Sequence, residues 1–328
     1  MPPPQAPYEP TPVSFDLPVY FPQLPIPADN PPTEEGIALG RKLFYDTRLS
    51  GDNSQSCASC HIQAFGFSDT VAFSIGIDGL PGKRNAMPII NVGWMDRLFW
   101  DGRATRPAHQ ATFPVADPLE MHADWDDVVS KLQADADYEE MFRKAFRTAG
   151  VTKDRVVKAI EQFELTMLSY HSKTDSVTMP GSGVFYTDLE QEGFDLFYSE
   201  RADCFHCHSG ILFTDNLFHN NGLDSVHDAD KGLYNVTHDD ADIGKFKTPT
   251  LRNIEFTAPY MHDGRFKTLD EVLDFYASGV QVSPTLDPLM SHQGGIQLDA
   301  HEKEALKAFL LTLSDRHFLE NPDFAKPD

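Results

Sequence analysis

Basic residues, long apolar runs and cysteine are all scarce in this chain, and the first two shortages each exclude a class of protein. Lysine and arginine number 27 against 50 aspartates and glutamates in 328 residues, which gives a formal net charge of −23. Such a surface repels nucleic acid and anionic membranes and suits a basic protein partner. No stretch approaches the roughly 18 uninterrupted apolar residues of a membrane-spanning helix. We therefore expect an acidic, soluble, globular protein with no membrane span and no nucleic-acid partner.

The four cysteines fall into two copies of one short pattern. The copies are Cys57-Ala58-Ser59-Cys60-His61 and Cys204-Phe205-His206-Cys207-His208. C-x-x-C-H is the attachment signature of c-type haem. Two thiols three residues apart face one side of a turn and can bond the two vinyl groups, and the next histidine then offers a ring nitrogen to the iron. The pattern predicts two covalently attached haem c groups, with His61 and His208 as iron ligands.

Two other interpretations of the cysteine pairs compete with haem. A single zinc ion could take one pair from each half, and either pair could be a thioredoxin-like redox motif. Zinc ribbons rarely separate their pairs by the about 140 residues found here. Neither pair lies in a recognisable βαβ pattern, and a histidine follows both pairs directly. These points favour haem.

Covalent haem attachment takes place outside the cytoplasm, so the two motifs imply a periplasmic protein. The first residues, Met1-Pro2-Pro3-Pro4-Gln5, have neither the basic nor the apolar region of a signal peptide. We expect that the signal peptide is absent from this chain and that Met1 is an artificial start.

The rest of the chain divides into an arm and a mostly helical body. Residues 1–32 hold twelve prolines without a helical period, which predicts an extended arm on the surface or on a partner. Apolar residues recur at helical spacing over 154–170, and a last helix is predicted from Asp299 towards Leu313. Strand patterns are few and short. Capping boxes predict further helix starts at Thr187-Asp188-Leu189-Glu190 and Thr268-Leu269-Asp270-Glu271.

An internal repeat relates the two halves. The matched segments are Gly40-x-x-Leu43-Phe44-Tyr45 with Gly193-x-x-Leu196-Phe197-Tyr198, Phe99-Trp100-Asp101-Gly102-Arg103 with Met261-His262-Asp263-Gly264-Arg265, and Asn91 with Asn253, each ten residues before its aspartate. We interpret these ordered matches as a duplication. The predicted fold is mainly α with long loops and little β. It consists of two tandem cytochrome c-like haem domains, 33–170 and 171–328, and we expect the last helix to pack back on the first domain.

The repeat also predicts a difference between the two irons. Pro114 lies thirteen residues after Asp101, and Tyr276 lies thirteen residues after Asp263. If the halves superpose, both residues lie on the far side of their haem from the motif histidine. Proline has no side-chain donor atom, so the first iron stays open, whereas a tyrosine phenolate can close the second. A core tyrosine on a helix is the ordinary alternative for Tyr276.

The chain resembles the bacterial di-haem cytochrome c peroxidase family, and within it the MauG branch, over roughly residues 36–316. The resemblance rests on both C-x-x-C-H motifs, the Phe99–Arg103 segment, Pro118-Leu119-Glu120-Met121, and Thr248-Pro249-Thr250-Leu251-Arg252-Asn253 through Pro259-Tyr260-Met261-His262-Asp263-Gly264. In the family the N-terminal haem reacts with peroxide and the C-terminal haem transfers electrons. This implies the same open and closed assignment as the repeat.

The resemblance also implies roles for residues that composition alone does not distinguish. Gln110, Pro114 and Glu120 match the pocket over the first haem, where a carboxylate can shuttle a proton between the two peroxide oxygens. Trp100 matches a tryptophan that family members hold between the haems, and a buried structural role is its alternative. A calcium ion between the haems is implied by the residues matching its site, which are Asn85, Thr257 and Pro259.

Two positions favour the MauG branch over ordinary di-haem peroxidases. The ordinary enzymes ligate the second haem with methionine where this chain has Tyr276, and many cap the resting first haem with a histidine in the loop after the motif. Here no histidine occurs from Gln63 to Pro107. One position departs from MauG, where a tryptophan two residues before the second motif passes oxidising equivalents to the partner. This chain has Ala202 there, so either Tyr198, Phe205 or direct transfer serves instead, or the substrate differs altogether.

The leading prediction is a periplasmic peroxidase that reacts with hydrogen peroxide and oxidises a protein at tryptophan or tyrosine, or an electron donor such as a small cytochrome c or a cupredoxin. The close alternative is an ordinary cytochrome c peroxidase that removes hydrogen peroxide with electrons from a small cytochrome c. A plain electron carrier with both irons six-coordinate is the alternative from a different class. If Tyr276 is not the second ligand, Met261 and Met290 are the next candidates.

Overall fold

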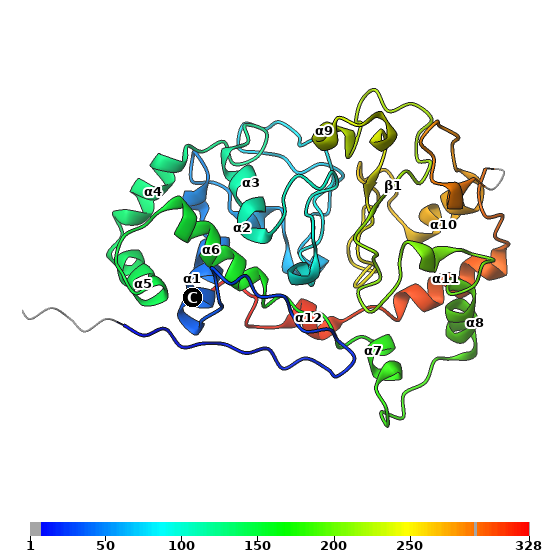
Figure 1. Ribbon diagram of the computed structural model, residues 1–328, viewed down its shortest axis with the longest axis horizontal. Helices are drawn as coiled ribbons and strands as arrows, with labels where there is room; N and C mark the ends of the chain where they lie inside the picture. Colours follow the sequence, from blue (N-terminus) through cyan, green and yellow to red (C-terminus); the bar gives the residue numbers. More distant parts are fainter. Residues whose placement is uncertain (1–7, 292–293, 328) are drawn as a thin grey trace, which may run out of the picture.

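The computed structural model describes residues 8–291 and 294–327, and in this part of the chain the protein is built from helices joined by long loops (Figure 1). The only strands described there are β1 (Phe218–His219) and β2 (Phe246–Lys247), which pair antiparallel. The predicted mainly helical fold with little β is confirmed. The α-helices are α1 (Glu34–Phe44), α2 (Pro107–Gln110), α3 (Thr112–Ala116), α4 (Trp125–Gln133), α5 (Ala136–Phe146), α6 (Lys153–Glu164), α7 (Lys173–Thr178), α8 (Asp188–Phe197), α9 (Tyr234–Thr237), α10 (Leu269–Ser278), α11 (Ala300–Leu311) and α12 (Arg316–Glu320).

The predicted helix starts agree with the structure, whereas one predicted helix end does not. Thr187 and Thr268 cap α8 and α10 with complete capping boxes, and Asp299 caps α11 in the same way. The helix predicted over 154–170 ends at Glu164. Beyond it the Asn91 amide donates to the Met167 carbonyl, and the Ser169 amide donates to the Asn91 side chain at 2.9 Å. These hydrogen bonds take the place of the helical backbone bonds. Apolar residues therefore continue at helical spacing beyond Glu164, although the backbone there is no longer helical.

Each half contains one closely packed helix pair, α1 with α6 and α8 with α11. A glycine makes each close approach possible. A Cβ placed on Gly40 would lie 1.9 Å from the Ala159 carbonyl oxygen, and a Cβ on Gly193 would lie 1.9 Å from that of Ala305. Neither site has room for any side chain, so the two glycines of the repeated sequence segments occupy matching positions in two similar helix crossings.

Other features of the repeated segments also match in geometry. Asn91 and Asn253 both adopt left-handed backbone conformations, with φ of 55° and 60°. Gly102 and Gly264 follow, with φ of 71° and 64°. An isolated antiparallel bridge closes the loop around each of these glycines, Leu98 with Ala104 and Tyr260 with Phe266.

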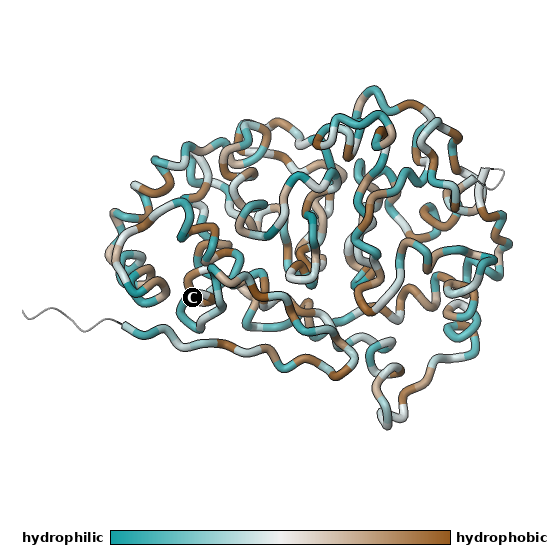
Figure 2. Tube along the Cα trace, in the orientation of Figure 1, coloured by the Kyte–Doolittle hydropathy of each residue, from teal (hydrophilic) through white to brown (hydrophobic). Residues whose placement is uncertain are grey.

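Hydrophobic residues recur along both halves (Figure 2), and each half buries its own core. The helix predicted from Asp299 is α11, which packs on α8 within the second half. The expected return of the last helix to the first domain is therefore not the main packing of α11. A further helix, α12, makes that return, because its Phe318 and Leu319 join the cluster of Phe44 and Phe67.

The proline-rich arm lies along both halves. Residues 8–32 contain no helix and run along the lower edge of the molecule, dark blue in Figure 1. Phe21 and Leu24 are buried in one cluster with Trp94 of the first half and Leu212 of the second. The Trp94 indole also donates to the Gln23 carbonyl at 3.3 Å. The described part of the arm thus bridges the two halves. Residues 1–7, which belong to the predicted arm, lie outside the described residues.

Candidate functional site

Each C-x-x-C-H motif forms one tight turn that ends on an oriented histidine. Cys57–Ser59 and Cys204–His206 are single 3₁₀ turns, which bring the two thiols of each motif to one side. His61 Nδ1 donates to the Phe67 carbonyl at 2.7 Å, and His208 Nδ1 donates to the Phe213 carbonyl at 3.2 Å. Each imidazole is therefore fixed in the tautomer whose Nε2 is free to bind a metal. Burial lowers the pKa of His208 to about 4 and that of His61 in the same direction, so both rings are neutral.

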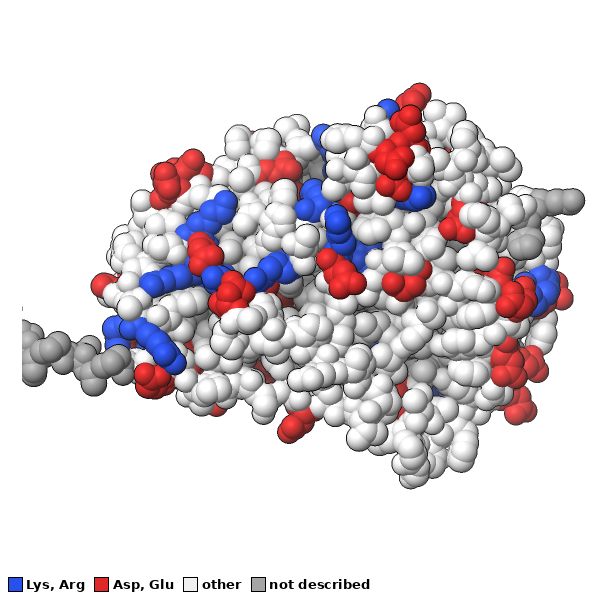
Figure 3. All heavy atoms as spheres, in the orientation of Figure 1, with Lys and Arg blue, Asp and Glu red and all other residues white. Residues whose placement is uncertain are grey.

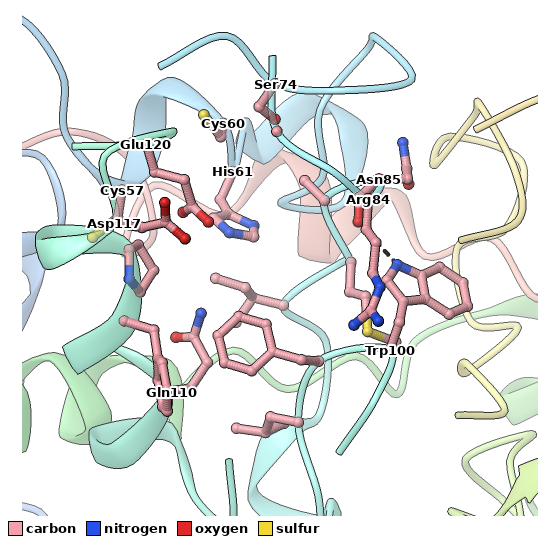
Figure 4. Close-up of a pocket in the computed structure, with 18 of the residues that line it drawn as sticks. Cys57, Cys60, His61, Ser74, Arg84, Asn85, Trp100, Gln110, Asp117 and Glu120 are labelled. Atoms are coloured by element: carbon pink, nitrogen blue, oxygen red, sulfur yellow. Dashed lines mark hydrogen bonds between the residues drawn. The ribbon is translucent and has the colours of Figure 1, made fainter. Parts of the chain in front are cut away.

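A cavity of about 1150 Å³ opens next to the first motif. Cys57, Cys60 and His61 line it together with Gln110, Pro114 and Glu120, so the structure brings these predicted residues together. In Figure 4 Gln110 and Glu120 face the same space as His61. The thiols form no disulfide. Two free thiols, a histidine with a free Nε2 and a large cavity beside them fit a covalently attached haem.

Glu120 is a strongly perturbed acid on the wall of this cavity. It follows α3, and its carbonyl accepts a hydrogen bond from the Ile77 amide at 2.9 Å. Burial and the nearby Asp117 carboxylate, opposed by Arg103, raise its pKa to about 7. A carboxyl group that titrates near neutrality can both accept and donate a proton, which is the requirement for a proton shuttle.

Trp100 lies where the first cavity meets the second half. Its side chain is 8% exposed, and its indole nitrogen donates to the Asn85 carbonyl at 2.9 Å. Its own carbonyl accepts from the amide of Lys247 at 2.9 Å. The His262 ring packs edge-on 6.4 Å from the Trp100 ring, counted between centroids. The indole is thus in contact with both halves, as a relay between two haems would have to be.

Of the three residues predicted to bind calcium, Asn85 lies near the segment that follows Pro259. The Asn85 amide donates to the His262 carbonyl at 2.8 Å, and His262 follows Pro259 by three residues. The Asn85 side-chain nitrogen donates to the Val71 carbonyl at 3.1 Å. Thr257 is buried next to Gly66. No contact among these described residues joins the three predicted oxygen ligands, so the calcium site stays a prediction.

Tyr276 on α10 faces the second motif. Its hydroxyl accepts a hydrogen bond from the Asn221 side chain at 3.3 Å. Burial, with a smaller effect of the nearby Cys207 and Cys204 and against the Asn221 hydrogen bond, raises the pKa of Tyr276 to about 12. The same Asn221 nitrogen lies 3.8 Å from the Met261 sulfur. Met261 and Met290 pack in one cluster with Tyr276, so the structure brings all three possible second-haem ligands together.

Sequence reasoning missed several charged residues of the first cavity, among them Glu164 and Lys247. Glu164 is buried on its wall beside Cys57, and burial with the nearby Glu161 raises the pKa of Glu164 to about 8. Its signal in the sequence is an acid four residues after Ile160 on an otherwise apolar helix face. Lys247 also lines the cavity, is 3% exposed, and donates to the Asn216 side chain at 2.8 Å. Burial lowers the pKa of Lys247 to about 8.

Arg84 joins the halves at the rim of the same cavity. Its guanidinium forms ion pairs with Asp101 of the first half and Asp230 of the second, each at 2.6 Å. Figure 4 places it beside Trp100. No motif containing Arg84 marks it in the sequence, because its partners lie 17 and 146 residues away.

Comparison with known proteins gives one consistent group of relatives. The sequence profile of the di-haem cytochrome c peroxidase family matches residues 34–182. Methylamine utilization protein MauG of Methylorubrum extorquens is 36% identical over 291 residues, which cover 88% of this chain and 81% of that protein. Cytochrome-c peroxidase IdrP1 of Pseudomonas sp. (strain SCT) is 32% identical, with 90% and 84% covered.

A solved structure is also similar to this chain over almost its whole length. It is the crystal structure of a MauG-like protein associated with microbial copper homeostasis, which superposes with a TM-score of 0.87 and 38% sequence identity. The match covers 96% of this chain and 99% of the other. The relatives thus include proteins named as MauG and proteins named as cytochrome c peroxidases.

Proposed function

This chain belongs to the di-haem cytochrome c peroxidase family, whose members are oxidoreductases that act on peroxide, and from that premise we propose that it is an enzyme of the MauG-like type. It uses hydrogen peroxide at an open first haem and passes the oxidising equivalents to a protein or electron-donor partner. The first pocket carries this proposal. There Glu120, with a pKa near neutrality, faces the space beside His61, and the neighbouring Pro114 offers no iron ligand.

The residues of the first pocket have distinct tasks in this proposal. When bound through the first motif, the haem supplies the iron at which peroxide is reduced. Glu120 takes a proton from one peroxide oxygen and returns it to the other as the O–O bond breaks. The Gln110 amide donates a hydrogen bond that orients the peroxide. Cleavage then needs no proton from bulk water at that moment.

In this proposal the protein consists of two haem domains, 33–170 and 171–328, that arose by duplication. The first domain reacts with peroxide, and the second passes on the oxidising equivalents. The support is the matched helix crossings at Gly40 and Gly193 and the matched left-handed residues Asn91 and Asn253. Cys204, Cys207 and His208 would hold a second haem c. Tyr276 would supply a further iron ligand, and Asn221 donates to its phenol oxygen.

Trp100 would couple the two haems when both are bound, so that the two oxidising equivalents taken from peroxide could be shared between them. Its support is the packing of the buried indole against both halves. A calcium ion held by Asn85, Thr257 and Pro259 would lie near this junction and brace it.

The partner docks on the second half in this proposal. Residues 171–328 carry 27 Asp and Glu against 12 Lys and Arg, whereas residues 1–170 carry 23 against 15. On the face drawn in Figure 3, acidic side chains dominate the end formed by α8 and α11. Ala202 is buried there, and the partly exposed Tyr198 packs near Phe205. We infer a basic protein partner that is oxidised through Tyr198 or directly. The protein acts in the periplasm, and no described helix is long and apolar enough to cross a membrane.

Addition of one equivalent of hydrogen peroxide to the ferric protein tests the proposal. We expect the absorption bands and electron paramagnetic resonance signals of both haems to change together, without a protein radical, and a partner tryptophan or tyrosine to become covalently oxidised. The Glu120→Gln variant should lose this reaction while both haems stay attached. A change confined to the first haem, with steady turnover on reduced cytochrome c, would contradict the MauG-like assignment.

An ordinary cytochrome c peroxidase is the second candidate function, and one observation favours it. The Met261 sulfur lies 3.8 Å from the same Asn221 nitrogen that contacts Tyr276, so a thioether is available for the second iron. The remaining alternative, a plain electron carrier, is distinguished by the electron paramagnetic resonance spectrum of the resting ferric protein. A high-spin ferric signal from one iron supports either enzyme, whereas low-spin signals alone would support the carrier.

A further inference from the structure

Two histidines and one aspartate meet where the chain passes between the two halves. They are His171, just after the first half, and Asp315 and His317, where the chain returns from α11 to α12. The possible ligand atoms of these three side chains all lie within 4.8 Å of one another. Asp315 is 0% exposed, whereas both histidines are exposed. The cluster lies outside the first cavity and is unrelated to either haem motif.

Asp315 is held rigidly. Its Oδ2 accepts hydrogen bonds from the Ser169 hydroxyl and the His171 amide, both at 2.9 Å. Its Oδ1 accepts from the Phe318 amide at 3.0 Å, which leaves that oxygen a second lone pair. The Asp315 amide donates to the Asn253 side chain at 2.7 Å. A carboxylate fixed from three directions is a preorganised ligand and needs little further ordering to bind a cation.

The two imidazoles lie side by side. Their centroids are 4.6 Å apart with an interplanar angle of 47°, and the His171 ring also packs on Tyr170 at 4.3 Å. Neither imidazole forms a hydrogen bond or an ion pair with any residue that the structure describes. The neighbouring Arg316 is engaged with Glu255 at 3.8 Å and with the face of Phe256. Ring nitrogens are therefore available next to a buried anion.

We propose that His171, His317 and Asp315 bind one divalent transition-metal ion, Cu²⁺ more tightly than Zn²⁺. Two neutral imidazoles and one carboxylate are ligands that suit these borderline ions, and water can complete the coordination. Copper is favoured because affinity for a given site rises along the divalent series to Cu²⁺ and falls again at Zn²⁺. The ion would link 171 to 315 and 317, and so clamp the crossover between the halves. This site does not depend on the proposed peroxidase function.

Titration of the holoprotein with Cu²⁺ tests the site. We expect one retained Cu²⁺ per chain after desalting, counted beside the haem iron by elemental analysis, and a Cu²⁺ resonance signal with nitrogen hyperfine structure. His171→Gln and His317→Gln should each weaken Cu²⁺ binding more than about tenfold, as loss of a ligand does. His301→Gln is the matched control, because that exposed histidine pairs with the Glu192 carboxylate at 2.8 Å and is not part of the cluster. It should bind copper like the unchanged protein.

The melting temperature provides a second readout. A ligand that binds only the folded state stabilises it, so Cu²⁺ should raise the melting temperature of the unchanged protein and of His301→Gln but not of the other two variants. Both histidines are exposed, and unchanged haem absorption would show that the variants fold. Equal copper affinity in all four proteins, or no copper retained by any, would overturn the site. Peroxide reactivity is measured separately, so a failure of the copper site and a failure of the proposed peroxidase function can be told apart.

Discussion

In the proposed reaction of the first pocket, Glu120 is the residue on which the transfer of the peroxide proton depends. Its pKa of about 7 is raised by burial and by Asp117, so the carboxylate that accepts the peroxide proton forms only as the pH passes neutrality. We predict that the rate of reaction with hydrogen peroxide rises with pH around a midpoint near 7. Stopped-flow measurement of this rate from acid to alkaline pH checks the prediction.

Two variants separate Glu120 from other titrating groups. Glu120→Gln should lower the rate by about 10²- to 10⁴-fold and remove the midpoint, because the amide cannot shuttle a proton. Asp117→Asn should keep a pH-dependent rate but move the midpoint to lower pH, because it removes the charge that raises the pKa of Glu120. An unchanged midpoint in Glu120→Gln would show that another group controls the reaction.

Tyr276 is the residue that separates the two candidate enzymes. A phenolate ligand favours ferric iron, so Tyr276→Phe should raise the reduction potential of the second haem and change its absorption spectrum while the first haem stays as it was. Spectroelectrochemical titration of both haems measures this. Met261→Leu is the control, since it removes the sulfur near Asn221 and leaves the phenol in place. A second haem that responds to Met261→Leu and not to Tyr276→Phe would be a methionine-ligated one.

Among the secondary-structure elements, the two helix crossings α1–α6 and α8–α11 set the positions of the motifs. Gly40→Ala and Gly193→Ala would each force a methyl group against a carbonyl oxygen, so we predict that each lowers the free energy of unfolding by about 2 kcal/mol or more. The two losses should be similar because the crossings are alike. Chemical denaturation monitored by circular dichroism checks this.

Gly82→Ala is the matched control for these two variants. The nearest atom to a Cβ at that position is the Ser74 carbonyl oxygen at 3.6 Å, an ordinary contact, so its stability should change little. If the two crossing variants were as stable as this control, close backbone contact would not be what holds the helix pairs together.

For the molecule as a whole, we expect the distribution of charge to govern binding of the proposed partner. The excess of acidic residues in 171–328 produces a negative field that attracts a basic donor protein, and salt screens such a field beyond about 10 Å at 0.1 M. We predict that kcat/KM with a basic c-type cytochrome falls steeply as ionic strength rises, with little change in kcat. Steady-state kinetics at several salt concentrations test it. An acidic cytochrome serves as the control, and equal salt dependence for both would argue against docking on the acidic half.

The sequence by itself determined what depends on local spacing. Thiols three residues apart with a histidine next in line predict the two haem-attachment sites, because that chemistry needs only one turn of chain. Ordered matches such as Gly40 with Gly193 indicated the two halves, and capping boxes placed helix starts. The apolar period over 154–170 misled at its end, because the Asn91 side chain, far away in sequence, takes over the backbone bonds that would have continued the helix.

Only the tertiary structure decided what depends on surroundings. The pKa values of Glu120 and Glu164 are raised by burial, which no residue type encodes. The nearness of Tyr276 to Met261, and of His171 to His317, arises where distant segments meet. Which side chain can bind the second iron depends on distances of a few ångströms, and the charge of a buried acid depends on desolvation. Both are fixed only when the chain has folded.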